Sequence, residues 1–397
     1  MVKLIRSGHS QRAVARKFHV ALHTVQRWID RAGDLNLEVV DWSNRAKVAH
    51  RVANKTSADL EQKVCQVRKQ LATTGALGFI GAQAIFDALA HSGDLSLLPS
   101  VRTIGRILRR QGLLDVQHRI RRTAPPPGWY LPAVSQQQAE LDSFDVVEDL
   151  RMEGVGLFQL FTTRTLWGAL AEAWPATVAS TSFILQAMQA HWELNGLPAF
   201  AQFDNDVRFQ GGHNHPDVIG RVMRFCLALG VTPVFAPPLE TGFQAMIENF
   251  NGLWQRKVWA RFHHESLQSL SVASKRFTHA YRRHLARNRD TETARRPFPT
   301  NWHADWQSHP SGTIIYLRRT NEHGAVKILG HMWDVDPLWP HRLLRCHVDL
   351  THHHINFYRL RRRAPEDQPL IKTLPYHLPQ RRFDTRPRHN HLMTPIR

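Results

Sequence analysis

Residues 136–265 begin with three successive strand-like runs and continue as an alternation of helices and strands, and this order constrains the fold more than any other feature. Strands are expected at residues 140–147, 156–162 and 166–173, in the run that ends at Asp204, and at residues 232–236. Helices are expected at residues 180–194 and 216–229 and around Glu248. Such an order indicates an α/β core, with a mixed sheet covered by helices.

Three carboxylates fall at informative places in these elements. Asp142 lies in the first strand, Asp204 follows the fourth, and Glu248 stands early in the last helix. Side chains so placed can converge on divalent cations. Hard Mg²⁺ prefers oxygen ligands, and two such ions roughly 3.5–4 Å apart can hold both oxygens of an in-line phosphoryl displacement.

Two further aspartates compete for these positions. Asp145 is the main alternative to Asp142, because it stands three residues later and faces the opposite side of a regular strand. Asp206 competes with Asp204, since residues two apart share a face in a strand. The residues alone leave both alternatives open.

The chain is strongly basic, with 52 Lys+Arg against 33 Asp+Glu and a formal net charge of +19 over 397 residues. Such a surface attracts polyanions with an affinity that falls as salt rises, so the phosphate under attack is expected to be that of DNA. The three cysteines stand far apart, which indicates reduced thiols. Because no signal peptide and no long apolar run are present, we expect a soluble, cytoplasmic protein with no membrane partner.

Residues 1–35 have the pattern of a helix-turn-helix unit. Ser10 is a suitable N-cap for a helix over residues 11–18, and His19 lies in the turn that leads to a second helix over residues 22–31. The outward face of the second helix is polar and suits base edges and phosphates, although a plain helical hairpin is an alternative. The candidate DNA contacts on this face are His23, Thr24, Gln26 and Arg27.

Residues 55–122 are expected to form a second helical DNA-binding unit. Ser100 precedes a helix over residues 101–111, and Gly112 is a sensible stop for it. The outward face of this helix carries the candidate DNA contacts Arg102, Thr103, Arg106, Arg109 and Arg110.

Composition sets the remaining boundaries. Three consecutive prolines, Pro125 to Pro127, predict a semi-rigid linker at residues 123–135. Beyond the core, we expect a basic helical connector at residues 266–310, a small β-barrel at 311–376, and a disordered basic tail at 377–397. The predicted fold is therefore multidomain, with all-α units before the α/β core and a β-barrel after it.

The core resembles the catalytic domain shared by retroviral integrases and bacterial insertion-sequence transposases, which has a ribonuclease-H-like fold and an Asp-Asp-Glu triad. The residues that carry this resemblance are Asp142 in the first strand, Asp204-Asn205 after the fourth, residues 224–231 ahead of Pro237-Pro238, and residues 247–251. The order of helix-turn-helix, second helical unit, core and small barrel also matches, so the similarity spans nearly the whole chain.

The resemblance implies that Asp142, Asp204 and Glu248 are both catalytic residues and ligands of two Mg²⁺ ions, for which Mn²⁺ can substitute. It implies a transposase that binds the ends of its mobile element and then cleaves and joins DNA strands, so that DNA is integrated. Such an enzyme works as a homo-multimer on double-stranded DNA, on both element ends and target, in the bacterial cytoplasm at the nucleoid.

The chain departs from the family pattern at three places. Where relatives usually have another aspartate on the second strand, this chain reads Thr162-Thr163-Arg164. Asp206 stands where relatives usually have a glycine that allows a positive φ, and Gln244-Ala245 replaces the usual Asn-Gly. These departures motivate an alternative function, a catalytically weak or inactive DNA-binding protein derived from a transposase. A ribonuclease-H-type nuclease acting on RNA–DNA hybrids is a further alternative, which the two N-terminal DNA-binding units disfavour.

Two histidine clusters invite a zinc interpretation. They are His213-Asn214-His215 and His352-His353-His354. Structural zinc usually takes four nitrogen or sulfur ligands at set spacings, and no cysteine pair accompanies either cluster. We therefore expect no zinc at these histidines.

Overall fold

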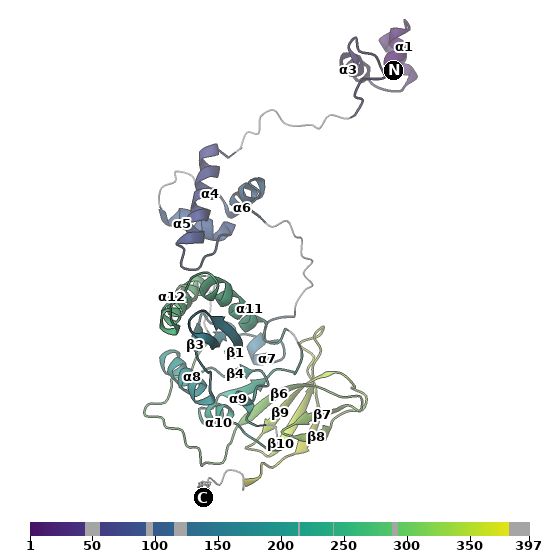
Figure 1. The fold of residues 1–397 in the computed structure, drawn as a ribbon. Coiled ribbons are helices and arrows are strands. Elements are labelled where there is room, and N and C mark those ends of the chain that lie inside the picture. The colour runs from purple at the N-terminus through teal and green to yellow at the C-terminus, as the bar shows by residue number, and fades with distance from the viewer. Residues whose placement is uncertain are drawn as a thin grey trace, which may run out of the picture. The chain divides into compact units, whose positions relative to one another are not determined.

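The computed structural model describes residues 1–43, 56–92, 98–114, 125–212, 215–240, 242–287 and 293–380 (Figure 1). The chain divides into two compact units at Glu61. Over the described ranges, no helix combines the length and the apolar character needed to cross a membrane.

The first unit consists of three short helices, α1 (Val2–Arg6), α2 (Gln11–Lys17) and α3 (Leu22–Ala32). Ser10 caps α2, because its hydroxyl accepts a hydrogen bond from the backbone N–H of Ala13 at 3.2 Å. His19 adopts φ +51° in the turn before α3, the backbone region in which such turns favour glycine. The two helices and the turn expected here are confirmed.

A second helical group contains α4 (Ala58–Thr73), which spans the division at Glu61, α5 (Ala82–Ser92) and α6 (Val101–Arg110). Ser100 caps α6 by accepting a hydrogen bond from the N–H of Thr103 at 3.2 Å. Gly112 follows α6 with φ +65°, a conformation that ends a helix at little cost for glycine. Apolar side chains that face inward at helical spacing form the core of the group; they are Val64, Ile85, Leu89, Ile104, Ile107 and Leu108.

The central sheet starts with three antiparallel strands, β1 (Leu141–Met152), β2 (Gly156–Thr165) and β3 (Ala171–Ala176). Strands β4 (Phe200–Phe203) and β5 (Thr232–Phe235) then add in parallel on the other side of β1. The third strand begins later than expected, because the chain turns between Thr165 and Leu170, which share a backbone hydrogen bond of 3.1 Å.

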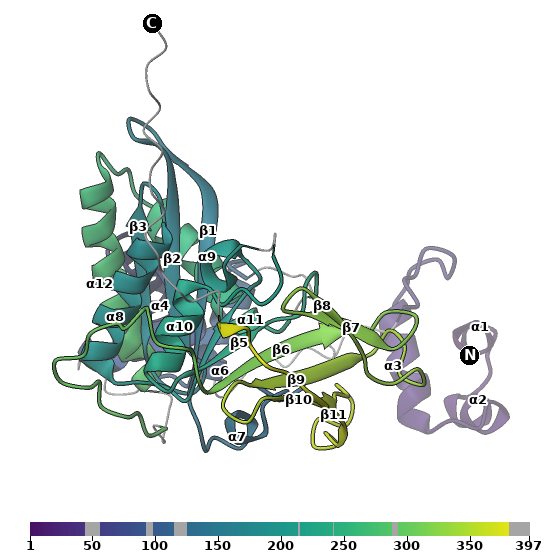
Figure 2. The same ribbon diagram turned by 90° about the horizontal axis from the view of Figure 1, so that it is seen from below.

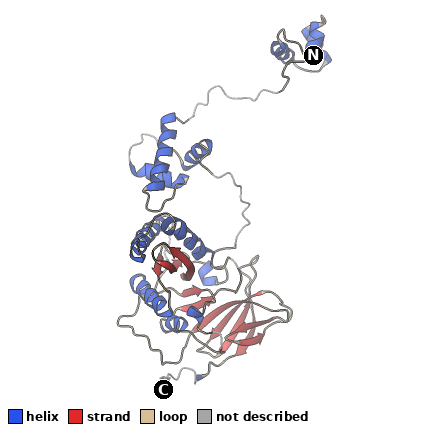
Figure 3. Ribbon diagram, viewed as in Figure 1, coloured by secondary structure: helices blue, strands red, loops and turns tan. Residues whose placement is uncertain are grey.

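Helices cover both faces of this part of the sheet, as Figures 1 and 3 show. One face is packed by α8 (Thr181–Asn195) and α10 (Arg221–Ala228), which bury Trp192 and Phe225 against Phe144 of β1. On the other face lie α11 (Ala245–Trp254), the π-helix η1 (Gln255–Trp259) and α12 (Leu267–Ala286). A short helix, α9 (Val207–Gln210), follows β4. The mixed, helix-covered sheet expected from the sequence is therefore present.

Helix α12 belongs to the core, which corrects the connector expected at residues 266–310. Its buried Phe277 and Tyr281 stack with Phe250 of α11, with ring centroids 6.5 and 5.4 Å away. The basic residues of α12 predict a connector, yet the apolar stripe on its other side decides where it packs.

The C-terminal strands continue the central sheet instead of closing into a barrel (Figure 2). Strand β6 (Thr313–Arg319) pairs in parallel with β5, and β9 (Leu343–Asp349), β10 (His354–Arg359) and β11 (Leu370–Pro375) extend the sheet beyond it. Within the described ranges the order is β11-β10-β9-β6-β5-β4-β1-β2-β3, and β7 (Ala325–Ile328) and β8 (His331–Asp334) form a separate hairpin. The expected small β-barrel is therefore wrong, because β5 offered an open edge that β6 pairs with.

The predicted linker also packs against the core. Trp129, Tyr130 and Leu131 are buried, and the short helix α7 (Pro132–Ser135) follows them. The Tyr130 hydroxyl donates a hydrogen bond to Gln202 Oε1 at 2.8 Å. The aromatic pair after the prolines thus anchors the chain. Of the other expected segments, residues 123–124 and most of the tail, 381–397, lie outside the described residues.

Candidate active site

The register of the sheet brings Asp145 level with Asp204. Strand β1 pairs in parallel with β4, with Asp142 opposite Ala201 and Ser143 opposite Gln202. When this register is continued by three residues, Asp145 falls beside Asp204, at the point where β4 has just ended. Both side chains are half-buried at this edge of the fold.

The charge of Glu248 also acts on Asp145. Burial raises the pKa of Asp145 to about 6, and the negative charges of Asp204 and, less strongly, Glu248 add to that rise. Burial also raises the pKa of Asp204. The carboxylates of Asp204 and Glu248 therefore both disfavour the charged form of Asp145, which is the condition that a divalent cation relieves.

Asn251 orients the Asp145 carboxylate. Its Nδ2 donates to Asp145 Oδ2 at 2.7 Å, while its Oδ1 accepts a hydrogen bond from the hydroxyl of Thr162 at 2.8 Å. Asn251 lies one helical turn after Glu248 on α11, and Thr162 is paired with Asp145 across β1 and β2. This buried chain fixes the position of the carboxylate relative to the helix that carries Glu248.

Asp142 lies elsewhere, in a buried salt bridge. Its Oδ1 and Oδ2 accept hydrogen bonds from Nη1 and Nη2 of Arg295 at 2.8 and 2.7 Å, and Trp192 Nε1 donates to Oδ2 at 3.0 Å. The carboxylate is fully buried toward α8. The structure thus does not bring Asp142 to Asp204 and Glu248, and Asp145 takes the place expected for it.

Asp206 is accommodated without backbone strain. Its φ is −62°, and its side chain caps α9 by accepting a hydrogen bond from the N–H of Arg208 at 2.7 Å. Arg208 Nε also donates to Asp206 at 2.9 Å, and Nη2 of the same arginine pairs with Glu148 at 2.8 Å. The positive φ for which a glycine was expected is absent at Asp206, and an arginine offsets the added negative charge.

This role gives a prediction for two variants. Asp206→Ala removes the cap and the ion pair and is expected to cost about 1 kcal/mol of stability, whereas Asp206→Asn keeps a capping oxygen and is expected to cost less. Urea unfolding of both variants beside wild type measures the difference. Equal stability of Asp206→Ala and wild type would contradict the capping role.

Glu248 is exposed in the first turn of α11. A carboxylate there is stabilised by the helix dipole, and its charge acts on Asp145. Among the described residues, no three His, Cys, Asp or Glu side chains are grouped closely enough to hold a metal ion. The donor set itself, three carboxylates, has the oxygen chemistry that Mg²⁺ prefers.

The predicted DNA contacts lie on the surfaces of two helices. On α3, His23, Gln26 and Arg27 are exposed and Thr24 is half-buried. On α6, the exposed arginines are Arg102, Arg106, Arg109 and Arg110, and the hydroxyl of Thr103 is hydrogen-bonded to that of Ser100 at 3.0 Å.

The histidine clusters have ordinary partners where the structure describes them. His352 Nδ1 pairs with Asp349 Oδ2 at 2.9 Å, and His354 Nδ1 lies 3.2 Å from the carbonyl oxygen of His352. His213 and Asn214 lie outside the described residues.

No family model matches the chain, and no curated protein matches it. Among solved structures, the chain is similar to one from a cryo-EM structure of a simian T-cell lymphotropic virus intasome in complex with the PP2A regulatory subunit B56 gamma. That similarity covers 73% of this chain and 91% of the other at 14% identity and a TM-score of 0.30.

Proposed function

We propose that this chain is a DNA transposase with an integrase-type catalytic core, in which Asp145, Asp204 and Glu248 form the catalytic triad. The observation that carries the proposal is the register that brings Asp145, within β1, level with Asp204, just after β4 ends, with the charge of Glu248 acting on Asp145. The reaction proposed is metal-dependent cleavage and transfer of DNA strands, as the resemblance of the sequence implies.

The three carboxylates would hold two Mg²⁺ ions, or Mn²⁺ in their place. When bound, such ions supply an activated water or 3′-hydroxyl and stabilise the leaving oxygen. Asn251 and Thr162 have the role of holding the Asp145 carboxylate in one orientation. Asp142 and Arg295 stabilise the strand from which Asp145 projects.

The proposed partners are the ends of the mobile element, a target duplex and further copies of this chain, in the bacterial cytoplasm. Support for DNA binding comes from the net charge of +19 and from the exposed polar faces of α3 and α6. Phosphate contacts position a protein on DNA, and base contacts give specificity.

The role of α6 can be tested with one arginine. Arg106→Ala is expected to weaken binding of element-end DNA and to lower the slope of log affinity against log salt by about one, because one phosphate contact is lost. Fluorescence anisotropy across a salt series measures this slope. Arg276→Ala, which removes an exposed arginine from α12, is the matched control and is expected to leave the slope unchanged. Equal slopes for Arg106→Ala and wild type would contradict a DNA contact at Arg106.

A second candidate function is a transposase-derived DNA-binding protein that has weak or no catalytic activity. The observation that favours it is that, in the ranges described, no three potential ligands are grouped tightly enough for a metal ion. A ribonuclease-H-type nuclease is disfavoured by the two N-terminal helical groups, which such an activity does not require.

A further inference from the structure

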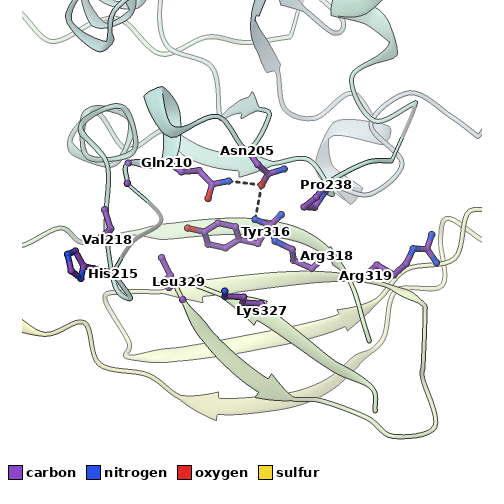
Figure 4. Close-up of a pocket in the computed structure, with 13 residues that line it drawn as sticks. Asn205, Gln210, His215, Val218, Pro238, Tyr316, Arg318, Arg319, Lys327 and Leu329 are labelled. Atoms are coloured by element: carbon purple, nitrogen blue, oxygen red, sulfur yellow. Dashed lines mark hydrogen bonds between the residues drawn. The ribbon is translucent and has the colours of Figure 1, made fainter. Parts of the chain in front are cut away.

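A cavity of about 500 Å³ begins one residue beyond Asp204, between the loop after β4 and the strands β6 and β7 (Figure 4). Asn205, in the loop after β4, and Gln210, the last residue of α9, line one side of it, and Tyr316, Arg318 and Lys327 line it from the strands. None of its thirteen lining residues is Asp or Glu. The volume falls in the range of small-molecule sites and is large enough for one nucleotide unit.

Arg318 stands in this cavity with neutral partners. Its Nη2 donates to Asn205 Oδ1 at 2.9 Å, and its Nη1 donates to the carbonyl oxygens of Leu317 and Ala236 at 2.8 and 3.2 Å. Burial lowers the pKa of Arg318, because the cation is poorly solvated in this cavity. Over the part of the chain that the structure describes, no carboxylate pairs with Arg318. A half-buried cation held by neutral oxygens is a ready partner for an anion.

Lys327 adds a second positive charge to the same cavity. It is exposed on β7, and within the described ranges its side chain forms no hydrogen bond or ion pair. The neighbouring Arg319 differs, because it pairs with Glu240 through Nε at 2.6 Å. The cavity therefore contains two cations that lack a carboxylate partner in the described ranges, Arg318 on β6, which pairs with β5 of the core, and Lys327 on the separate β7–β8 hairpin.

Asn205 connects the cavity to the carboxylates. It follows Asp204 directly, and its Oδ1 accepts hydrogen bonds from both Arg318 and Gln210, the second at 2.6 Å (Figure 4). The amide side chain of Asn205 thus links Arg318 to the carboxylate site. A nucleic-acid strand that runs across the carboxylates can place its neighbouring phosphate within reach of this pair of cations.

We propose that the cavity between β4, β6 and β7 binds one nucleotide unit of the DNA strand adjacent to the reacting phosphate, with that unit's phosphodiester held by Arg318 and Lys327. This inference rests on the proposed function, because it takes the carboxylates to be the reaction site. Asn205 is assigned a positioning role, holding the guanidinium of Arg318 toward the cavity.

The test is a double-mutant cycle that combines the loss of one side chain with the neutralisation of one phosphate. DNA binding is measured on the full chain without divalent metal. The probes are element-end duplexes taken from the DNA that flanks this gene, each with a neutral methylphosphonate at a single position near the cleaved end. At one position, wild type is expected to bind about tenfold more weakly than it binds unmodified DNA. Lys327→Ala is expected to lose about the same on unmodified DNA and nothing further at that position.

Lys372→Ala, which removes a lysine of β11 outside the cavity, is the matched control and is expected to show no coupling to any phosphate. Since Lys327 is exposed, its replacement is not expected to unfold the chain, and Arg318→Lys provides a second, charge-conserving variant that is expected to keep part of the coupling. Additive losses for Lys327→Ala at every phosphate position would overturn the proposal.

This outcome is distinguishable from failure of the proposed function, which is read from Mg²⁺-dependent strand transfer. Strand transfer without any coupling at Lys327 would remove the cavity proposal alone. If Lys327 contributed to the binding of inorganic phosphate but not to that of DNA, the cavity proposal would also be overturned, because the cavity would then be a site for small free anions.

Discussion

Asp145→Asn is expected to lower the rate of Mg²⁺-dependent strand transfer by roughly 10⁴-fold or more, as is usual when one member of a catalytic group is lost. The side chain keeps its shape and can still accept the hydrogen bond from Asn251, so the loss comes from the missing negative charge. The measurement is joining of labelled element ends to a target duplex, with binding of the same ends followed by fluorescence anisotropy. End binding is expected to remain within about twofold of wild type, because the predicted DNA contacts lie on α3 and α6.

The matched control is Asp149→Asn, which removes an exposed carboxylate from the same strand. Asp149 has φ +54°, a conformation that asparagine tolerates, so the control is expected to keep both structure and strand transfer. If Asp145→Asn retained wild-type strand transfer, the assignment of the first carboxylate to Asp145 would be wrong.

Arg295→Ala is expected to lower the free energy of unfolding by about 3–5 kcal/mol, because it leaves the buried Asp142 carboxylate without its partner. The pair is bidentate, and Arg295 also donates to the carbonyl oxygen of Gly196 at 2.8 Å, so it ties residues after α12 to both β1 and the end of α8. The measurement is urea or thermal unfolding of the metal-free protein.

The same measurement distinguishes the two aspartates of β1. Asp142→Asn is expected to destabilise the metal-free protein, because it leaves the guanidinium of Arg295 buried without a charge partner. Asp145→Asn is expected to leave stability unchanged or to raise it, because burial and two neighbouring carboxylates disfavour the charged form of Asp145. Equal destabilisation by both changes would contradict the roles assigned to Asp142 and Asp145.

The sequence could predict elements that depend on local signals. The apolar run before Asp204, the caps at Ser10 and Ser100 and the stop at Gly112 are such signals, and the structure confirms the elements they mark. Asp204 itself follows a strand as expected. These positions depend on residues a few places away, which a pattern in the chain can show.

The first carboxylate could not be fixed in this way, because it depends on how β1 pairs with β4. The two strands are separated by about fifty residues, and only their register shows that Asp145 lies beside Asp204. The partner of Asp142 is equally distant, since Arg295 stands 153 residues further along the chain. Long-range pairing of this kind leaves no local signal.

The C-terminal strands show the same limit on a larger scale. Their short lengths and turns predicted strands correctly, but neither feature reveals whether a sheet closes on itself or adds to another. Strand β6 pairs with β5 and so extends the core, and the cavity beside Asn205 exists because of that pairing. Trp129 and Tyr130 follow Pro127 and are buried, whereas the three prolines before them predicted a linker.

The most direct test of the central claim is a strand-transfer assay with Mg²⁺ or Mn²⁺ on element ends taken from the DNA that flanks this gene, with wild type beside Asp204→Asn. We predict metal-dependent joining by wild type and none by Asp204→Asn, with equal end binding by both. Tight, salt-sensitive binding of the ends by wild type with no cleavage in either metal would contradict the account and would identify a DNA-binding protein that keeps the fold without the reaction.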